Sequence, residues 1–348
     1  MVVRNSTISR FRHKFRAMIR YKTMLAAAAF VLATPLASQS GTPVAPTEQP
    51  LSQSLPGAFV ATPDGEGPFP AIILLGGSEG GDSAARRLAT RFLEQGYAVI
   101  GYPFYSPAYF GQAAQFPDLP RAFAAIPVDR METVMEAARA NPAIGDAPIG
   151  LYGVSKGAEF ALLAASLIEG FDAVAAIVPS DVVWEGWGPG IIEGESSSFS
   201  WRGEPLPFVP YVGMTAEIAK YADPDATPRL RTPQDLGRHR NPDAVAAARI
   251  RVEEIDEPVL VAGGDQDNTW ASGEMAQYIA ERRYAAGLPT VSLIFTDAGH
   301  GLSGDGTQIT SGSFRYSDAD LAAQAVIWPQ TLSFFARYLK RERISQAN

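Results

Sequence analysis

The chain has 348 residues, 46% of them hydrophobic and 19% charged, which is the composition of a globular protein that can bury a substantial core. It contains no cysteine, and this excludes thiol nucleophiles, disulfides and thiolate metal sites. The formal net charge of −8 argues against nucleic acid or an anionic membrane as a partner.

Residues 1–40 have the pattern of a secretory signal. Seven basic residues and no acidic one precede an apolar run from Met24 to Ala37. The run is too short to span a bilayer comfortably and is followed by small and polar residues, so we expect cleavage near Ala37 to Ser40. The product would be periplasmic or secreted, without stable membrane association, and its formal net charge would move from −8 to −15. An uncleaved anchor helix is the alternative.

Residues 41–55 are proline-rich and polar, and they predict a linker or mobile arm before a domain over 56–343. Within that domain, short apolar runs predict buried strands, and helical patterns lie between them. The strands are expected at 57–62, 71–75, 97–102, from 149 to the motif described below, and at 173–178, 258–262 and 290–295. The helices are expected at 84–95, 128–140, from that motif to about 169, and at 273–286 and 318–339. This alternation predicts an α/β fold with a mostly parallel, doubly wound sheet.

The alternation stops between about residues 184 and 249, where Gly, Pro, Trp and Arg are frequent. A connection of that length without structure of its own is uncommon unless it has a function. We therefore expect the segment, called the lid below, to be an insertion that contains short helices.

The segment from Gly153 to Gly157, called the elbow below, fits the G-x-S-x-G pattern of a nucleophile elbow. In such a turn a strand leads sharply into a helix, and the glycines allow the two elements to approach closely while the serine is lifted above the sheet. Five residues with three fixed positions also occur by chance. Ser155 is therefore a candidate nucleophile, and the other residues expected around it have to show whether it is one.

A serine nucleophile needs a base, and the usual base is histidine. His13 lies in the predicted signal and His239 in the lid, whereas His300 follows a predicted strand on a loop at the carboxyl end of the sheet. A carboxylate that orients this base is expected between serine and histidine in the chain. Asp267 is favoured and Asp265 is the alternative, although both could merely cap the next helix or shape the turn.

A developing oxyanion needs backbone N–H donors, and Lys156, directly after the serine, supplies the first. The glycine-rich segment 76–81 follows a strand and can supply the second at Gly77 or Ser78. It lacks the Lys-Ser/Thr pair that follows the last glycine of a phosphate-binding loop. With two histidines left after signal cleavage and no cysteine, no metal and no cofactor are expected.

With these residues placed, the chain resembles the C-terminal catalytic domain of the acyl-CoA thioesterase and bile-acid-CoA:amino-acid N-acyltransferase family, an α/β-hydrolase branch near dienelactone hydrolase. The resemblance runs from about Phe69 to Leu339. It rests on the segments 69–80, 150–159, 201–207 and 264–270, and on Gly299-His300 followed by Trp328.

The resemblance implies Ser155 as nucleophile, as in the thioesterase members, with Asp267 as acid and His300 as base. The sequence then predicts a serine hydrolase that cleaves a small-molecule acyl ester or thioester through an acyl-serine intermediate. A carboxylesterase acting on a small non-CoA ester, an acyltransferase and, more remotely, a non-catalytic binding protein are the alternatives. Five lid aromatics are expected either to line an acyl pocket or to pack the lid onto the domain: Trp184, Trp187, Phe199, Trp201 and Phe208.

Overall fold

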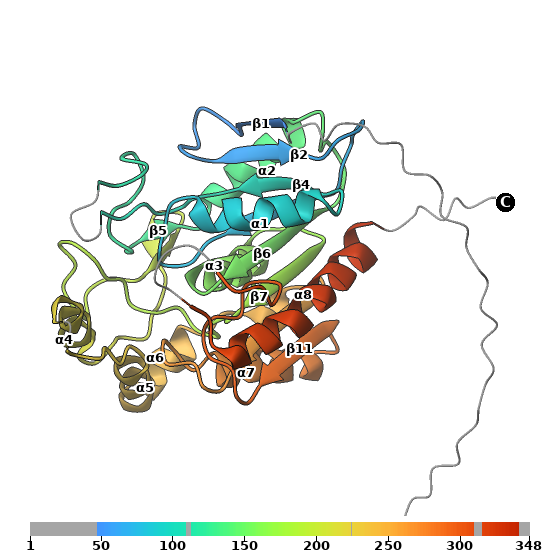
Figure 1. Cartoon of the computed structure of the whole chain (residues 1–348). Helices are drawn as coiled ribbons and strands as arrows, with labels where there is room; N and C mark the ends of the chain where they lie inside the picture. The colour runs from blue at the N-terminus through green and yellow to red at the C-terminus, as the bar shows by residue number, and fades with distance from the viewer. Residues whose placement is uncertain (1–46, 109–112, 224, 310–314, 341–348) are drawn as a thin grey trace, which may run out of the picture. The chain divides into compact units, whose positions relative to one another are not determined.

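The computed structural model describes residues 47–108, 113–223, 225–309 and 315–340 (Figure 1). The predicted signal over residues 1–40 lies outside these ranges. The described chain forms an α/β fold around a mostly parallel sheet, and this confirms the predicted fold class. Within the described ranges, no helix has the length and apolar character that a bilayer crossing requires.

The central sheet contains eight strands in the order β1-β2-β4-β3-β6-β7-β10-β11. The β1–β2 and β2–β4 pairs are antiparallel, and all other neighbours are parallel. The strands are β1 (Thr47–Pro50), β2 (Phe59–Thr62), β3 (Ala71–Leu75), β4 (Ala98–Gly101), β6 (Ile149–Val154), β7 (Ala173–Ile177), β10 (Val259–Gly264) and β11 (Thr290–Phe295). Because the parallel strands all end at one edge, the loops that follow them meet there.

Helices cover both faces of this sheet and bury a separate apolar cluster on each (Figure 1). Successive residues of β3 point to opposite faces, so that Ile73 and Leu75 enter one cluster whereas Ile72 and Leu74 enter the other. The first cluster packs under α2 (Arg130–Ala140), α3 (Lys156–Leu167) and α7 (Ser272–Ala285). The second packs under α1 (Ser83–Leu93) and α8 (Asp318–Leu339).

The lid is built from short elements, as expected. Its helices are α4 (Met214–Ala219), η1 (Lys220–Ala222), α5 (Arg231–Arg240) and α6 (Pro242–Ala247), and η2 (Val252–Glu254) follows it. The lid also contributes β8 (Phe199–Trp201) and β9 (Glu204–Pro205) to a small sheet of order β5-β8-β9. The third member, β5 (Ile126–Pro127), comes from the segment before α2, so that the lid is joined by backbone pairing to a distant part of the chain.

Two sequence expectations were wrong. The segment 41–55 was expected to be a linker, but its residues Thr47–Pro50 pair with Phe59–Thr62 as the edge strand β1, while residues 41–46 lie outside the described ranges. Residues 48–50 are exposed, so the strand is held by backbone pairing and leaves no alternating apolar pattern in the sequence. Similarly, the predicted helix from residue 128 begins at Arg130, because β5 and a turn occupy the positions before it.

Candidate active site

The elbow turns directly from β6 into α3. Ser155 has φ 55° and ψ −120°, a region that side-chain-bearing residues adopt only when the surrounding structure imposes it. The serine is 8% exposed, and its backbone N–H donates to the carbonyl of Ile177 at 2.9 Å. The strained turn therefore lies at the carboxyl end of the sheet, between β3 and β7.

Both elbow glycines are required by close packing. A Cβ atom on Gly157 would lie 2.3 Å from the carbonyl oxygens of Leu75 and Gly76, at the end of β3. A Cβ atom on Gly153 would lie 2.2 Å from the carbonyl oxygen of Gly157. The close approach that the sequence predicted for these glycines is thus present, and it brings the loop after β3 against the start of α3.

A relay of hydrogen bonds starts at the serine. His300 Nε2 lies 3.0 Å from Ser155 Oγ, and His300 Nδ1 lies 2.7 Å from Asp267 Oδ2. The three residues come from the loops after β6, β10 and β11. The carboxylate is fully buried, whereas the imidazole is 28% exposed. This geometry allows His300 to accept the serine proton while the carboxylate fixes the imidazole tautomer.

Asp267 is held in place by its own loop and by the lid. Its Oδ1 accepts the backbone N–H groups of Thr269 at 2.8 Å and Trp270 at 3.2 Å, which leaves Oδ2 for the histidine. Arg231 of α5 donates to the carbonyl of Asp267 at 3.2 Å. The sequence alternative Asp265 is exposed, and the structure does not bring its side chain to His300.

The histidine loop is fixed from α8. The backbone N–H of Gly299 donates to Asp320 Oδ1 at 2.7 Å, and Ser317 caps the helix by accepting the N–H of Asp320. Trp270 packs edge-on against the His300 ring, with 5.9 Å between the ring centroids. By contrast, His239 is exposed on α5, and His13 lies outside the described residues.

Of the predicted oxyanion donors, Lys156 and Gly77 lie next to Ser155. Lys156 is the first residue of α3, so its N–H has no acceptor within the helix and is available to a ligand. Gly77 lies beside the serine, since a Cβ added to it would be 3.2 Å from Ser155 Cβ. The Gly77 N–H donates to Glu79 Oε1 at 3.1 Å in a turn that has Ser78 and Glu79 at its centre. An oxyanion at Gly77 would have to replace this carboxylate.

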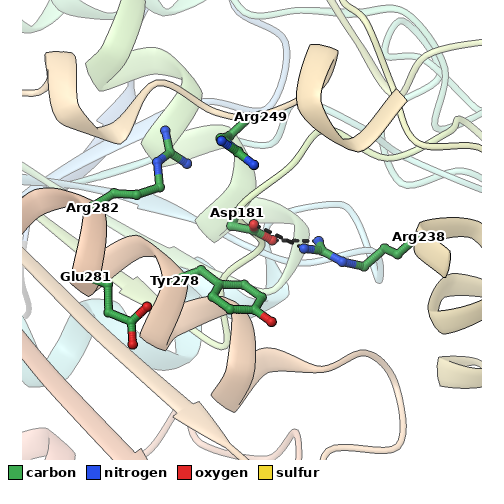
Figure 2. A pocket seen from close by; sticks show the side chains of 6 residues that line it. All are labelled: Asp181, Arg238, Arg249, Tyr278, Glu281 and Arg282. Atoms are coloured by element: carbon green, nitrogen blue, oxygen red, sulfur yellow. Dashed lines mark hydrogen bonds and ion pairs between the residues drawn. The ribbon is translucent and has the colours of Figure 1, made fainter. Parts of the chain in front are cut away.

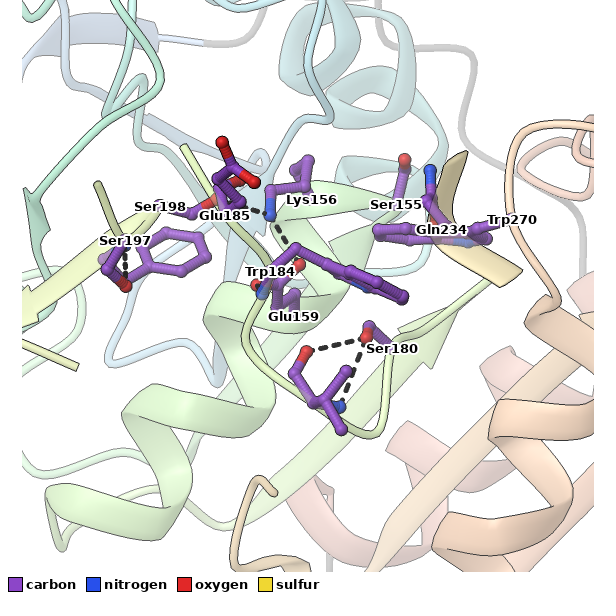
Figure 3. Close-up of polar contacts among 12 residues, drawn as sticks. Ser155, Lys156, Glu159, Ser180, Trp184, Glu185, Ser197, Ser198, Gln234 and Trp270 are labelled. Carbon is purple, nitrogen blue, oxygen red and sulfur yellow. Dashed lines mark hydrogen bonds and ion pairs between the residues drawn. The ribbon is translucent and has the colours of Figure 1, made fainter. Parts of the chain in front are cut away.

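The Lys156 side chain turns away from Ser155 into the protein (Figure 3). Its ammonium donates to Glu159 Oε2 at 2.7 Å and to Ser198 Oγ of the lid at 3.0 Å. Lys156 is 4% exposed and Glu159 is fully buried. Burial lowers the pKa of Lys156 and raises that of Glu159, and their mutual attraction opposes both shifts. Two opposite charges three residues apart in an otherwise apolar helix were a signal of this pair that sequence reasoning missed.

The lid aromatics pack the lid onto the domain. Trp184 and Phe199 are fully buried, and Trp184 stacks on Tyr211 with 5.6 Å between the ring centroids. Trp187 stacks on Phe123, at 6.1 Å, and Trp201 and Phe208 are partly buried against the same apolar cluster. Of the two roles expected for these five residues, packing is therefore the one that the described contacts support.

A separate cavity of about 340 Å³ lies at the base of the lid (Figure 2). Its lining includes Asp181, to which Arg238 of α5 donates at 2.7 Å. The remaining lining residues are Arg249, Tyr278, Glu281 and Arg282. None of the relay residues lines this cavity, so it does not mark the site around Ser155.

The chain is similar to known families and proteins. Over residues 129–304 it matches the family described as BAAT / Acyl-CoA thioester hydrolase C terminal, and over residues 57–184 it matches the dienelactone hydrolase family. It is 26% identical over 304 residues to acyl-coenzyme A thioesterase 2, mitochondrial, of Mus musculus, covering 83% of this chain and 60% of that protein. It is also 26% identical over 307 residues to acyl-coenzyme A thioesterase 1 of Mus musculus, covering 84% of this chain and 65% of that protein.

The chain thus spans less than two thirds of the length of these two relatives. Among solved structures, the acylaminoacyl peptidase of Pyrococcus horikoshii is similar with a TM-score of 0.50 and 13% sequence identity. That similarity covers 82% of this chain and 40% of the other, and it concerns the fold alone.

Proposed function

Because this chain belongs to the family described as BAAT / Acyl-CoA thioester hydrolase C terminal, we propose that it is a serine hydrolase of acyl esters or thioesters. The observation that carries the proposal is the relay from Ser155 through His300 to the buried Asp267, at 3.0 and 2.7 Å. The strained elbow supports it as well, since strain of this kind is found where a nucleophile is held for reaction.

In the proposed reaction Ser155 Oγ attacks the acyl carbonyl carbon while His300 Nε2 accepts the hydroxyl proton. Asp267 remains ionised and stabilises the imidazolium that forms. The N–H of Lys156 and that of Gly77 or Ser78 hold the oxyanion. When the intermediate collapses, the C–S or C–O bond breaks, His300 returns its proton to the leaving group, and an acyl-serine remains. A water molecule, deprotonated by His300, then releases the acid and restores the serine.

The leaving group is proposed to be a thiol, because the relatives named above are acyl-coenzyme A thioesterases. An oxyester substrate uses the same residues and the same order of steps. An acyltransferase would also form the acyl-serine, but it would deliver the acyl group to an acceptor other than water. These three readings differ in the leaving group or the acceptor, and the experiment below distinguishes them.

We also propose that the protein is exported. The basic stretch up to Lys22 and the apolar run from Met24 to Ala37 support this proposal. Fractionation of cells that produce the full chain, with mass determination of the N-terminus, tests it. A protein that keeps its first 40 residues and stays in the cytoplasm would contradict it.

Turnover of a matched set of acyl thioesters and acyl oxyesters tests the function. The set includes acyl-CoA and a short acyl thioester without phosphates, each with and without an amine acceptor. The wild type is expected to release free acid and thiol, and the Ser155→Ala variant is expected to lose at least about a thousandfold in rate. Faster oxyester turnover would favour a carboxylesterase, and acyl transfer to the amine would favour an acyltransferase. Equal rates for the wild type and Ser155→Ala would contradict the proposal.

A further inference from the structure

One residue of the elbow connects the reaction centre to the lid. The backbone N–H of Lys156 is a proposed oxyanion donor, whereas its ammonium is buried among residues of α3, the lid and the segment before α2. The ammonium lies over the rings of Phe123, at 4.9 Å, and Phe199, at 5.1 Å. Two ring faces and two oxygen acceptors thus surround one charge, which fixes the side chain in a single place.

Glu159 completes a connection in the opposite direction. Its Oε2 accepts from the ammonium, and its Oε1 accepts the backbone N–H of Trp184, the first residue of the lid, at 3.2 Å. Ser198 Oγ, which the ammonium reaches, donates in turn to the carbonyl of Glu185 at 2.8 Å. The pair therefore contacts both the beginning of the lid and the residue before β8 (Figure 3).

A buried ion pair is a costly way to hold two segments together. Desolvation of both charges offsets much of their attraction, so well-packed apolar residues would often give equal or greater stability. What apolar residues lack is direction, because each contact of a charged group with a hydrogen-bond partner fixes an orientation. The two oxygens of Glu159 and the ammonium of Lys156 fix the lid backbone relative to the first turn of α3.

We propose that Lys156 and Glu159 form a positioning pair that holds the lid at Trp184 and Ser198 in register with the oxyanion-binding N–H of Lys156. The proposal rests on the proposed function of the site. Neither side chain touches the reacting atoms. The pair acts through the backbone of the elbow and through the placement of the lid above it, so its loss is expected to lower kcat more than it raises KM.

The double variant Lys156→Met/Glu159→Gln tests this role. Methionine approximates the length of lysine, and glutamine keeps an oxygen for the Trp184 N–H. Each single substitution leaves one buried charge unpaired and is expected to lower the melting temperature, whereas the double variant is expected to recover most of it. Because displacements of about 1 Å at a reacting centre can cost about a hundredfold in rate, kcat of the double variant is expected to stay about tenfold to a hundredfold below the wild type.

Ser198→Ala provides a second variant that keeps the ion pair. It removes the hydroxyl that accepts from Lys156 and donates to the carbonyl of Glu185, so kcat is expected to fall several-fold and the melting temperature by a few degrees. If the Lys156 and Glu159 variants do not fold, the kcat of Ser198→Ala tests the proposal by itself. Arg202→Met/Glu132→Gln is the matched control, since this exposed pair at 2.6 Å joins the lid to α2 without touching the elbow, and its kcat is expected to stay unchanged.

A double variant that recovers both the melting temperature and the wild-type kcat would overturn the proposal and leave the pair a structural role only. Wild-type kcat in a folded Ser198→Ala variant would also count against it. Failure of the proposed function has a different signature, because the wild type itself would then hydrolyse no ester or thioester. Labelling of Ser155 by a fluorophosphonate, measured as a rate in each variant, separates the two cases.

Discussion

The backbone N–H of Gly77 donates to the carboxylate of Glu79 at 3.1 Å, beside the side chain of Ser155. An exposed carboxylate from the same loop thus occupies a donor that the proposed reaction assigns to the oxyanion. Binding of a substrate carbonyl has to displace it, and its negative charge lies near the point where negative charge develops.

Glu79→Gln is therefore expected to raise kcat/KM. The glutamine oxygen still accepts from Gly77, but a hydrogen bond to a neutral acceptor is roughly 1 kcal/mol weaker than one to a charged acceptor, which corresponds to about fivefold in rate. Steady-state kinetics on one ester measures the change, with Glu94→Gln at the exposed end of α1 as control. A fall in kcat would instead mean that the carboxylate organises the loop for reaction.

Asp267→Asn is expected to reduce kcat by roughly a thousandfold to ten-thousandfold with the fold intact, because the amide favours the wrong imidazole tautomer. The matched control is Asp265→Asn, two residues away on the same loop but exposed, which is expected to leave kcat unchanged. Kinetics and circular dichroism on both variants check this. Equal losses in the two variants would contradict the assignment of Asp267.

Gly157→Ala is expected to lower the free energy of unfolding by at least about 1–3 kcal/mol and to abolish most activity. The added methyl group would clash with the carbonyl oxygens at the end of β3. Gly145→Ala separates this effect from backbone strain. Gly145 has φ 52° and no atom within 4 Å of an added Cβ, so it is expected to lose about 1 kcal/mol and keep full activity. Denaturant titrations measure both losses, and a stable, active Gly157→Ala variant would contradict the packing argument.

Tyr152, which precedes the elbow in β6, is expected to make the protein less stable at alkaline pH. Burial raises the pKa of Tyr152 to about 12 from its ordinary value of 10.0. Between these two values the unfolded chain releases the phenolic proton and the native protein keeps it. The free energy of unfolding therefore falls as pH rises, by about 1.4 kcal/mol per pH unit from this residue. Unfolding titrations of the wild type and Tyr152→Phe are expected to show a shallower slope in the variant, and identical slopes would contradict this.

The helices and strands whose bounds the sequence predicted correctly are those with a clear apolar or helical pattern in the sequence. Ala71–Leu75, Thr290–Phe295 and Asp318–Leu339 were predicted with the bounds that the structure has. A continuous apolar run or a long helical pattern marks an element over its whole length. The strands β1, β5, β8 and β9 were missed. Residues 48–50 of β1 are exposed, and the two or three residues of β5, β8 and β9 are too few to show such a pattern.

The candidate site was predicted in part. Ser155 and His300 followed from the motif, the chain order and the few histidines. The position after the strand favoured Asp267 with Asp265 as the alternative, and the family resemblance implied Asp267. The hydrogen bond from the Gly77 N–H to the Glu79 carboxylate was not predicted, because it depends on how the loop after β3 folds back on itself. The contacts of Glu159 with the lid join residues 25 apart, and this pairing follows from tertiary packing that no local pattern reports.

Labelling of Ser155 with a fluorophosphonate tests the central claim most directly. The reagent requires a serine hydroxyl activated by a nearby base, so peptide mapping of the folded wild type is expected to find one adduct, on Ser155. His300→Ala is expected to label at least about a hundredfold more slowly, because the hydroxyl then has no base to accept its proton. An unlabelled wild type, or an adduct on another residue, would contradict the account.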